Sequence, residues 1–135
     1  ELLVYDADTW RPYCHVQDFS RLIKLVLEAP RQKTSWQVFN AGGDENNATK
    51  RTISELILEK IPSGKIKYQE HGTDPRNYRV SFSKVESVLG FNPKYNIQDG
   101  IDELVKAINN HIFDNVESSK NFHGNYEIDM KELNG

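Results

Sequence analysis

The residue types that could do chemistry gather in the nine residues from Trp10 to Asp18. Arg11 presents a planar fork of donors that matches the oxygens of a phosphate. Tyr13 follows two positions later, so in an extended segment it projects from the same face. Such a pair can clamp an anion and can stack on, or hydrogen-bond to, a base or a sugar. The alternative is a salt-bridged surface arginine beside a tyrosine at the edge of the core, and these residues alone leave both interpretations open.

Two other polar side chains of this stretch indicate structural roles. His15 directly precedes Val16 and an amphipathic segment, which favours a half-buried histidine whose hydrogen bonds are satisfied. Asp18 is a good N-cap for the helix that this segment predicts, and capping is favoured over acid catalysis. The residues of this stretch are therefore divided between candidate ligand contacts and supports for the turn into the helix.

Neither a nucleophile nor a metal site is predicted. Cys14 and His15 are sequence neighbours, so in an extended segment their side chains point to opposite faces and cannot easily form a thiol–imidazole pair. None of the four histidines has another ligand at a recognised zinc spacing. Cys14 is also the single cysteine, which excludes an internal disulfide and favours a reducing compartment such as the cytoplasm.

A second polar patch follows at residues 71–78. Asp74 and Arg76 lie there in an irregular segment, where they could contact a ligand or form an ion pair with each other. The formal net charge of the chain is −3, which argues against nucleic acid as a partner because phosphate binding needs a concentrated basic face. No apolar run reaches the roughly 20 residues of a membrane span, so no membrane partner is expected.

The elements that must position these residues alternate between short strands and helices, which predicts an α/β fold. Strands are expected at residues 2–5, 36–40 and 65–69, and helices at residues 19–29, 53–61, 84–89 and 97–112. Two to four strands are too few for a complete doubly wound sheet, and the chain does not begin with Met. We therefore expect a portion of a larger protein, with one region at residues 1–113, for which the resemblance described next implies substrate binding, and a polar tail at 114–135 that holds a possible short strand at 126–128.

Four pieces of the sequence, in this order, resemble the C-terminal part of the extended short-chain dehydrogenases/reductases, the NAD-dependent nucleotide-sugar epimerases and dehydratases. The pieces are RPYCHVQDFSRLI, VFNAGG, TISELI and DPRNYRVSFSKVESVLGFNPKYNIQDGIDEL. The likeness covers about residues 2–112. It implies a Rossmann-type enzyme of which this chain is the nucleotide-sugar-binding portion, with few strands, several helices and a small substrate-binding subdomain.

The resemblance also implies roles for single residues. Arg11 would contact the diphosphate of the nucleotide sugar with Tyr13 beside it, whereas His15 and Asp18 would hold the turn into the helix. Asp74 lies four residues before a tyrosine, as the nucleotide-contacting polar residue of the family often does. Several members place a phosphate-binding arginine where this chain has His71. Here either Arg76 or His71 would bind the phosphate, or the nucleotide sits differently.

The catalytic half of the family pattern is absent from this sequence. There is neither a glycine-rich dinucleotide loop nor a Tyr-x-x-x-Lys pair. The resemblance thus implies that NAD(P) binding and catalysis belong to an N-terminal Rossmann portion of the same protein, and that these 135 residues alone bind no cofactor and are inactive. Two alternatives stay open: a non-catalytic protein of this fold that senses a cofactor or acts as a scaffold, and a free-standing small α/β binding module. A homodimer is a further partner that the resemblance allows.

Overall fold

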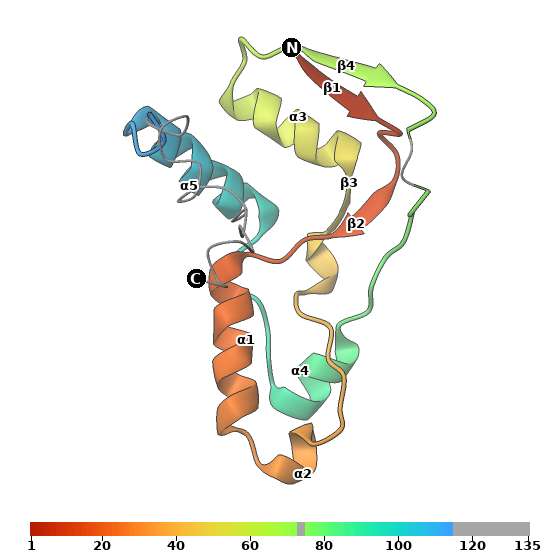
Figure 1. Ribbon diagram of the computed structural model, residues 1–135, viewed down its shortest axis with the longest axis vertical. Helices are drawn as coiled ribbons and strands as arrows, with labels where there is room; N and C mark the ends of the chain where they lie inside the picture. Colours follow the sequence, from red (N-terminus) through yellow and green to blue (C-terminus); the bar gives the residue numbers. More distant parts are fainter. Residues whose placement is uncertain (73–74, 115–135) are drawn as a thin grey trace, which may run out of the picture. The chain divides into compact units, whose positions relative to one another are not determined.

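The computed structural model of the chain describes residues 1–72 and 75–114. It forms two compact units, residues 1–102 and residues 103–135. The elements in chain order are β1 (Leu2–Tyr5), β2 (Trp10–Pro12), α1 (Val16–Glu28), α2 (Arg31–Thr34), the short 3-10 helix η1 (Asp44–Asn46), β3 (Asn47–Thr49), α3 (Lys50–Lys60), β4 (Ile66–Gln69), α4 (Ser83–Leu89) and α5 (Ile97–Asn109) (Figure 1). The strand predicted at 126–128, like most of the predicted tail, lies outside the described residues.

The four described strands form two small sheets. β1 pairs with β4 in parallel, with Leu2 opposite Ile66. β2 pairs with β3 in antiparallel fashion, with Arg11 opposite Ala48. Residues 6–9 form a turn between β1 and β2, in which the backbone N–H of Thr9 donates to Asp6 O at 3.1 Å. The predicted α/β class with few strands is thus confirmed.

One predicted strand does not form. Trp36 lies in a turn with φ 59°, and residues 37–40 pair with no described strand. The aromatic and β-branched residues that predicted a strand there are present, yet a strand also needs a neighbour for its N–H and C=O groups. The prediction is therefore wrong for the described part of the chain, and its failure identifies an extended segment that lacks a partner.

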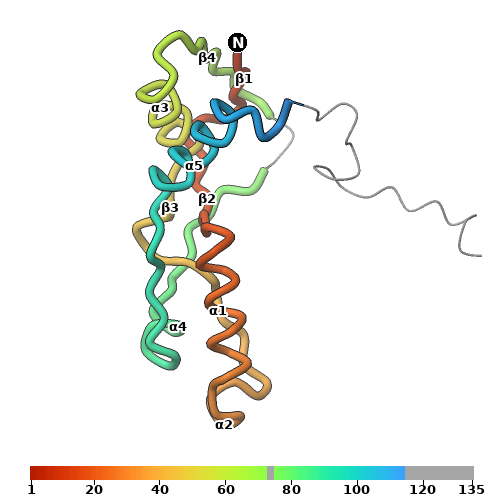
Figure 2. The backbone as a smooth tube through the Cα atoms, turned by 90° about the vertical axis from the view of Figure 1, so that its left-hand side faces the viewer, coloured from red at the N-terminus to blue at the C-terminus, as the bar shows by residue number. Residues whose placement is uncertain are grey.

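The core of residues 1–102 lies between α1 and α4, which stand side by side in both views (Figure 1 and Figure 2). Leu22 of α1 packs there with three residues of or beside α4, namely Phe82, Val85 and Phe91. Gly90 ends α4 in the left-handed conformation, with φ 66°, which a glycine adopts without strain. None of the described helices has the length and apolar character that a membrane crossing requires.

Two pairs in the sequence, Thr52 with Glu55 and Asn96 with Asp99, have the spacing of a capping box, which predicts a helix start at each. The second is confirmed: Asn96 Oδ1 accepts from Asp99 N at 3.0 Å, and Asp99 Oδ2 accepts from Asn96 N at 2.8 Å. The first is wrong, because the N-cap of α3 is Thr49, whose hydroxyl accepts from Thr52 N at 3.1 Å. The helix therefore begins three residues earlier than predicted.

Candidate functional site

Arg11 lies in the middle of β2, with its guanidinium against an aromatic ring. Its Nη1 donates to Trp10 O at 2.7 Å, and its Cζ lies 5.5 Å from the centroid of the Tyr78 ring. A guanidinium over an aromatic face is attracted by the quadrupole of the ring while its edge still presents donors. The structure therefore places Arg11 against Tyr78, which was not among the predicted contact residues.

Tyr13 follows β2 and has a more apolar environment than expected. Burial raises the pKa of its hydroxyl, and the positive charge of Arg11 opposes that rise, so the two side chains are close enough to interact electrostatically. Tyr13 also lines a mostly apolar cavity of about 330 Å³ between β1 and α3, together with Leu2, Leu3, Val4, Tyr5, Lys50, Ile53, Ser54 and Ile57. Its ring is thus partly a packing element.

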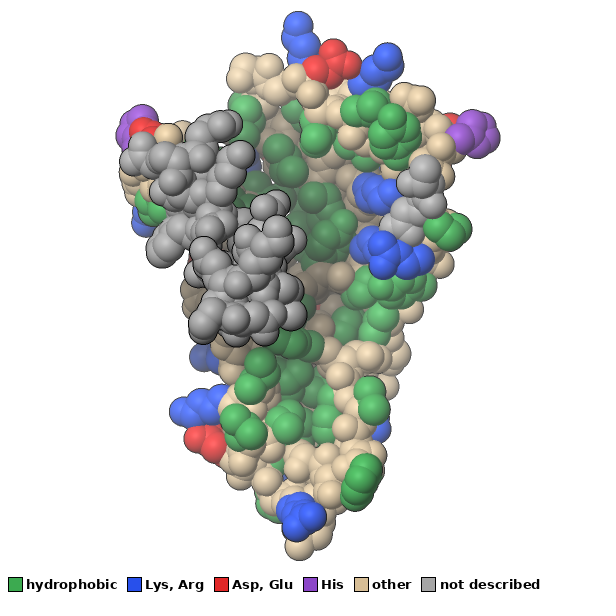
Figure 3. Space-filling model, viewed as in Figure 1, with side chains coloured by type: hydrophobic (Ala, Val, Ile, Leu, Met, Phe, Trp, Pro, Cys, Tyr) green, Lys and Arg blue, Asp and Glu red, His purple; other side chains and the backbone are tan. Residues whose placement is uncertain are grey.

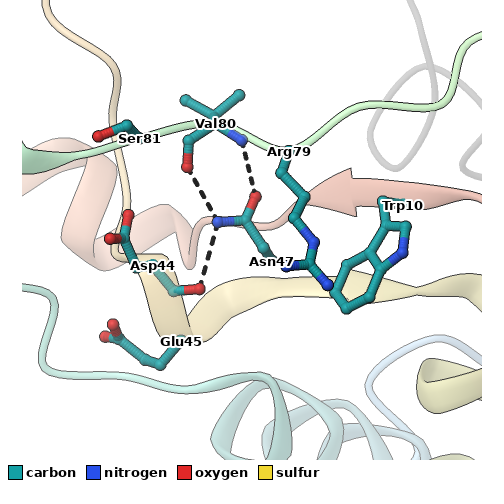
Figure 4. A pocket seen from close by; sticks show the side chains of 7 residues that line it. All are labelled: Trp10, Asp44, Glu45, Asn47, Arg79, Val80 and Ser81. Atoms are coloured by element: carbon teal, nitrogen blue, oxygen red, sulfur yellow. Dashed lines mark hydrogen bonds between the residues drawn. The ribbon is translucent and has the colours of Figure 1, made fainter.

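The segment that begins at residue 75 runs beside β2. Tyr78 N donates to Trp10 O at 3.3 Å, and Asn77 Oδ1 accepts from Trp10 N at 2.9 Å. Arg79 then stacks on Trp10, with its Cζ 3.4 Å from the centroid of the indole ring (Figure 4). Two arginine–aromatic pairs therefore cross between the two segments, Arg11 with Tyr78 and Arg79 with Trp10. The alternation of an aromatic residue and an arginine at 10–11 and 78–79 is the signal that could have found the second pair.

A cavity of about 490 Å³ opens beside the Trp10–Arg79 pair; it is lined by Trp10, Asp44, Glu45, Asn47, Arg79, Val80 and Ser81. Asn47 stands at its centre: its amide nitrogen donates to Val80 O at 2.9 Å and to Asp44 O at 3.2 Å, and its Oδ1 accepts from Val80 N at 3.0 Å (Figure 4). Arg79 and Trp10 form one end of the cavity, and the carboxylates of Asp44 and Glu45 lie toward the other (Figure 4).

His71 lies in a separate cavity of about 450 Å³; its lining is Asp6, Asp8, Thr9, Glu70, His71, Gly72, Pro75 and Asn77. Asp6 Oδ2 accepts from Gly72 N at 2.8 Å, and Asp8 pairs with Arg51 at 2.7 Å. Three carboxyl groups thus border His71, and their charge disfavours a phosphate there. Arg76 is exposed and belongs to the lining of neither this cavity nor the one beside Trp10. Asp74 lies outside the described residues.

Asp18 is not the N-cap of α1, contrary to the prediction. The helix begins at Val16, and the cap is His15, whose Nδ1 accepts from Gln17 N at 3.3 Å. Asp18 is fully buried in the first turn, where it accepts from the backbone N–H groups of Lys94 and Tyr95, at 2.9 Å in each case, and pairs with Arg21. This carboxylate therefore ties a loop 76 residues away to the start of α1.

The loop that Asp18 holds also packs on His15. The rings of His15 and Tyr95 are stacked, with centroids 4.4 Å apart, and Tyr95 OH donates to Gln17 Oε1 at 2.9 Å. Burial, with the nearby charge of Asp18 adding to it, raises the pKa of the Cys14 thiol, which keeps it protonated. Across residues 1–72 and 75–114, no group of three His, Cys, Asp or Glu side chains is placed to hold a metal ion.

One solved structure that shares this fold is a short-chain dehydrogenase/reductase superfamily protein from Agrobacterium tumefaciens with bound NAD, which has 17% identity and a TM-score of 0.70. The dTDP-glucose 4,6-dehydratase of Bacillus anthracis, solved in complex with NAD, has 28% identity and a TM-score of 0.65, and the match covers 84% of this chain and 36% of that one. The UDP-glucuronic acid 4-epimerase of Bacillus cereus, solved with UDP-glucuronic acid and NAD, has 22% identity and a TM-score of 0.66, covering 81% and 35%. The fold is thus that of part of a Rossmann-type enzyme.

A curated relative agrees with this class. The chain is 33% identical over 104 residues to a dTDP-glucose 4,6-dehydratase of Actinoplanes sp., a match that covers 74% of this chain and 31% of the relative. No protein-family model matches the sequence. These findings confirm the resemblance to the extended short-chain dehydrogenases/reductases of the epimerase and dehydratase group, and the chain spans about a third of the length of the relatives that it matches.

Proposed function

We propose that this chain is the nucleotide-sugar-binding portion of an NAD-dependent epimerase or dehydratase, and that Arg11 supplies its diphosphate contact. The observation that carries the proposal is the position of Arg11 on β2, opposite Ala48 and against the Tyr78 ring. A guanidinium held by a strand and flanked by aromatic rings can pair with diphosphate oxygens through its fork while a base or sugar packs on a ring. The matched structure that holds UDP-glucuronic acid supports this class of ligand.

The surroundings of one glycine pair support the placement of the cofactor site outside this chain. The glycine pair at 42–43 packs against protein: a Cβ on Gly42 would lie 2.8 Å from the Phe82 ring, and one on Gly43 would lie 2.5 Å from the Glu45 carboxylate. Neither glycine opens a cradle for a pyrophosphate, so no step of the reaction is assigned to this chain. In this proposal NAD(P) and the acid/base residues belong to the N-terminal Rossmann portion of the same polypeptide, and the 135 residues alone are inactive. A cytoplasmic location and a homodimer stay predictions.

Of the predicted contacts, Arg11 and Tyr13 keep their proposed roles, and Tyr78 joins them. Asp74 stays a prediction. His71 is the weakest member, because the carboxyl groups of Asp6, Asp8 and Glu70 surround its cavity. If a second phosphate contact exists in this patch, Arg76 suits it better than His71, since a guanidinium keeps its charge at every physiological pH.

Titration calorimetry with UDP, dTDP, GDP and CDP tests the diphosphate assignment. Arg11→Ala should weaken binding of the preferred nucleotide by roughly 1.5–3 kcal/mol, or about 10- to 150-fold, because a charge-assisted contact is lost. Arg31→Ala is the matched control, an exposed arginine on α2. An unchanged dissociation constant for Arg11→Ala, with a melting temperature equal to that of the control, would show that Arg11 does not contact the diphosphate.

A further inference from the structure

The cavity beside Trp10 and Arg79 is separate from the proposed diphosphate contact. Successive side chains of a strand project from opposite faces, so Trp10 and Arg11 leave β2 on opposite sides. Neither Arg11 nor its aromatic partner Tyr78 is among the residues that line the cavity. The proposed function therefore does not account for this cavity of about 490 Å³.

One end of the cavity is basic. On the face drawn in Figure 3, basic side chains lie directly beside hydrophobic ones where β2 and the segment 75–81 run together. The guanidinium of Arg79 stacks on Trp10, and no described residue accepts a hydrogen bond from it or forms an ion pair with it. Stacking holds a guanidinium in place while its edge still presents donors. The N–H groups of Arg79 can therefore bind an anion that enters the cavity.

The other end of the cavity is acidic, because the carboxylates of Asp44 and Glu45 lie toward it (Figure 4). Asp44 Oδ1 accepts from Phe82 N at 3.1 Å, which fixes the position of that carboxylate. Within the part of the chain that the structure describes, no cation pairs with either carboxylate, and Arg79 in particular does not. The cavity therefore holds opposite charges at two ends that do not neutralise each other.

The wall between the two ends is neutral. The amide nitrogen of Asn47 donates to Val80 O and to Asp44 O, and its Oδ1 accepts from Val80 N (Figure 4). Both donors of this amide are therefore occupied, and the Trp10 indole adds apolar surface at the basic end. A charged group in the middle of the cavity would find no partner of opposite sign, whereas an uncharged skeleton could lie against this wall.

We propose that this cavity is a second binding site, and that its ligand is a small zwitterion whose opposite charges are separated by several bonds, as in an ω-amino acid. The carboxylate of the ligand pairs with Arg79, and its ammonium group lies beside Asp44 and Glu45. A guanidinium can bind a carboxylate through two parallel hydrogen bonds, and an ammonium group donates to carboxylates. The skeleton of the ligand lies along Asn47. This site is distinct from the nucleotide-sugar contact and goes beyond the proposed function.

The choice of ligand class follows from the charges at the two ends. A dianion such as inorganic phosphate could pair with Arg79, but it would be repelled by the two carboxylates. A diamine would be repelled by the guanidinium in the same way. An α-amino acid carries its two charges on neighbouring atoms, so it can reach one end of the cavity and not both. Separation of opposite charges is therefore the property for which the cavity selects.

Ligand titration of the full polypeptide that contains this chain, followed by NMR with isotope-labelled tryptophan, tests the proposal. The probes are γ-aminobutyrate, δ-aminovalerate and ε-aminocaproate. The matched control is norleucine, an isomer of ε-aminocaproate with its amino group next to the carboxylate, and caproate and hexylamine each lack one charge. We expect the indole signal of Trp10, assigned with Trp10→Phe, to shift with at least one probe. Its dissociation constant should be about tenfold or more below that of every control compound.

Substitutions test the two ends of the cavity separately. Glu45→Gln and Arg79→Gln should each weaken binding of the best probe about threefold to tenfold, because each removes one charged contact at a partly solvated site. Arg79→Lys keeps the positive charge and should weaken binding less. The matched controls are Glu28→Gln and Arg31→Gln, which change exposed side chains of α1 and α2 and should leave the dissociation constant unchanged.

Three results would overturn the proposal. The first is an indole signal of Trp10 that shifts with none of the three ω-amino acids, and the second is norleucine binding as tightly as ε-aminocaproate. The third is a dissociation constant that neither Glu45→Gln nor Arg79→Gln changes. None of these measurements involves a nucleotide, so they can fail while the Arg11 assay succeeds, and the reverse.

Discussion

Removal of the Asp18 carboxylate should destabilise the protein far more than removal of an exposed carboxylate on the same helix. Asp18 is fully buried and accepts from the backbone N–H groups of Lys94 and Tyr95, besides its pair with Arg21. Asp18→Ala leaves two backbone donors without an acceptor, at about 1–3 kcal/mol each when they stay buried. The substitution also removes the partner of the Arg21 guanidinium. Because that side chain is 37% exposed and can be solvated, this adds little to the loss of stability. We expect a total loss of about 3 kcal/mol.

Asp18→Asn separates the two contributions. The amide keeps one oxygen that can accept from Lys94 or Tyr95, but it loses the charge that faces Arg21, so a loss of about 1–2 kcal/mol is expected. The control is Glu28→Gln in α1. The Glu28 side chain is 64% exposed, and its Oε1 lies 3.7 Å from Lys24 Nζ. An exposed pair of this kind contributes roughly 0.5 kcal/mol or less.

Urea unfolding followed by circular dichroism measures all three variants against the parent protein. The urea midpoint should be highest for Glu28→Gln, lower for Asp18→Asn and lowest for Asp18→Ala, with an unchanged denaturant slope. Hydrogen exchange at Lys94 and Tyr95 gives the local readout, because these amides should exchange faster in both Asp18 variants and not in Glu28→Gln. An Asp18→Ala midpoint within error of the control would refute the reasoning that this carboxylate holds the loop.

Two further predictions concern surface pairs. Arg79→Ala should lower the free energy of unfolding by roughly 0.5–1 kcal/mol and shift the fluorescence of Trp10, since it removes the stacked guanidinium; Arg31→Ala, which has no such ring, should change neither. The Arg51 guanidinium lowers the pKa of Asp8, so this pair contributes stability above the ordinary pKa of an aspartate, about 3.9, and loses it as the pH falls through the lower folded value. Acid titration of Asp8→Asn should therefore show a smaller loss of stability below about pH 4 than the parent, and an equal loss would contradict the pairing.

The elements that local pattern specifies could be predicted from the sequence, and the long-range contacts could not. The apolar spacing behind Val16 predicted α1, and Asn96 with Asp99 predicted the start of α5, because caps and helix faces depend on residues three or four apart. Asp18 has the residue type of a cap, but its partners lie 76 and 77 positions away. The choice of His15 as the cap follows from that distant contact, which no local pattern contains.

The same distinction explains the site. Arg11 could be singled out by its chemistry and its neighbours, whereas its aromatic partner Tyr78 comes from a segment that the sequence described as irregular. The stack of Arg79 on Trp10 joins positions 69 residues apart. Segment 36–40 shows the converse, since its residues are those of a strand but the described part of the chain contains no neighbour for it. Strand propensity is a statement about packing against neighbours, so it fails where the neighbour is elsewhere.

Apart from the backbone bond from Tyr78 N to Trp10 O, the segment that supplies Tyr78 and Arg79 is held by side chains and not by a strand ladder. Asn77 Oδ1 accepts from Trp10 N, Asn47 pairs with both the N–H and the C=O of Val80, and Asp44 Oδ1 accepts from Phe82 N at 3.1 Å. A side-chain amide that pairs with both backbone groups of one residue substitutes for a neighbouring strand at that point.

This mode of attachment decides what the site depends on. The pairing of Arg11 with Tyr78 is fixed by Asn77 and Asn47, neither of which is placed to contact a diphosphate through a charge. Asn77 satisfies the backbone N–H of Trp10, and Asn47 satisfies both backbone groups of Val80, so loss of either amide would loosen the segment that carries the ring beside Arg11 while leaving the guanidinium on β2. The geometry of the proposed clamp is therefore set by neutral residues of β3 and the 75–81 segment as much as by the arginine that would bind the ligand.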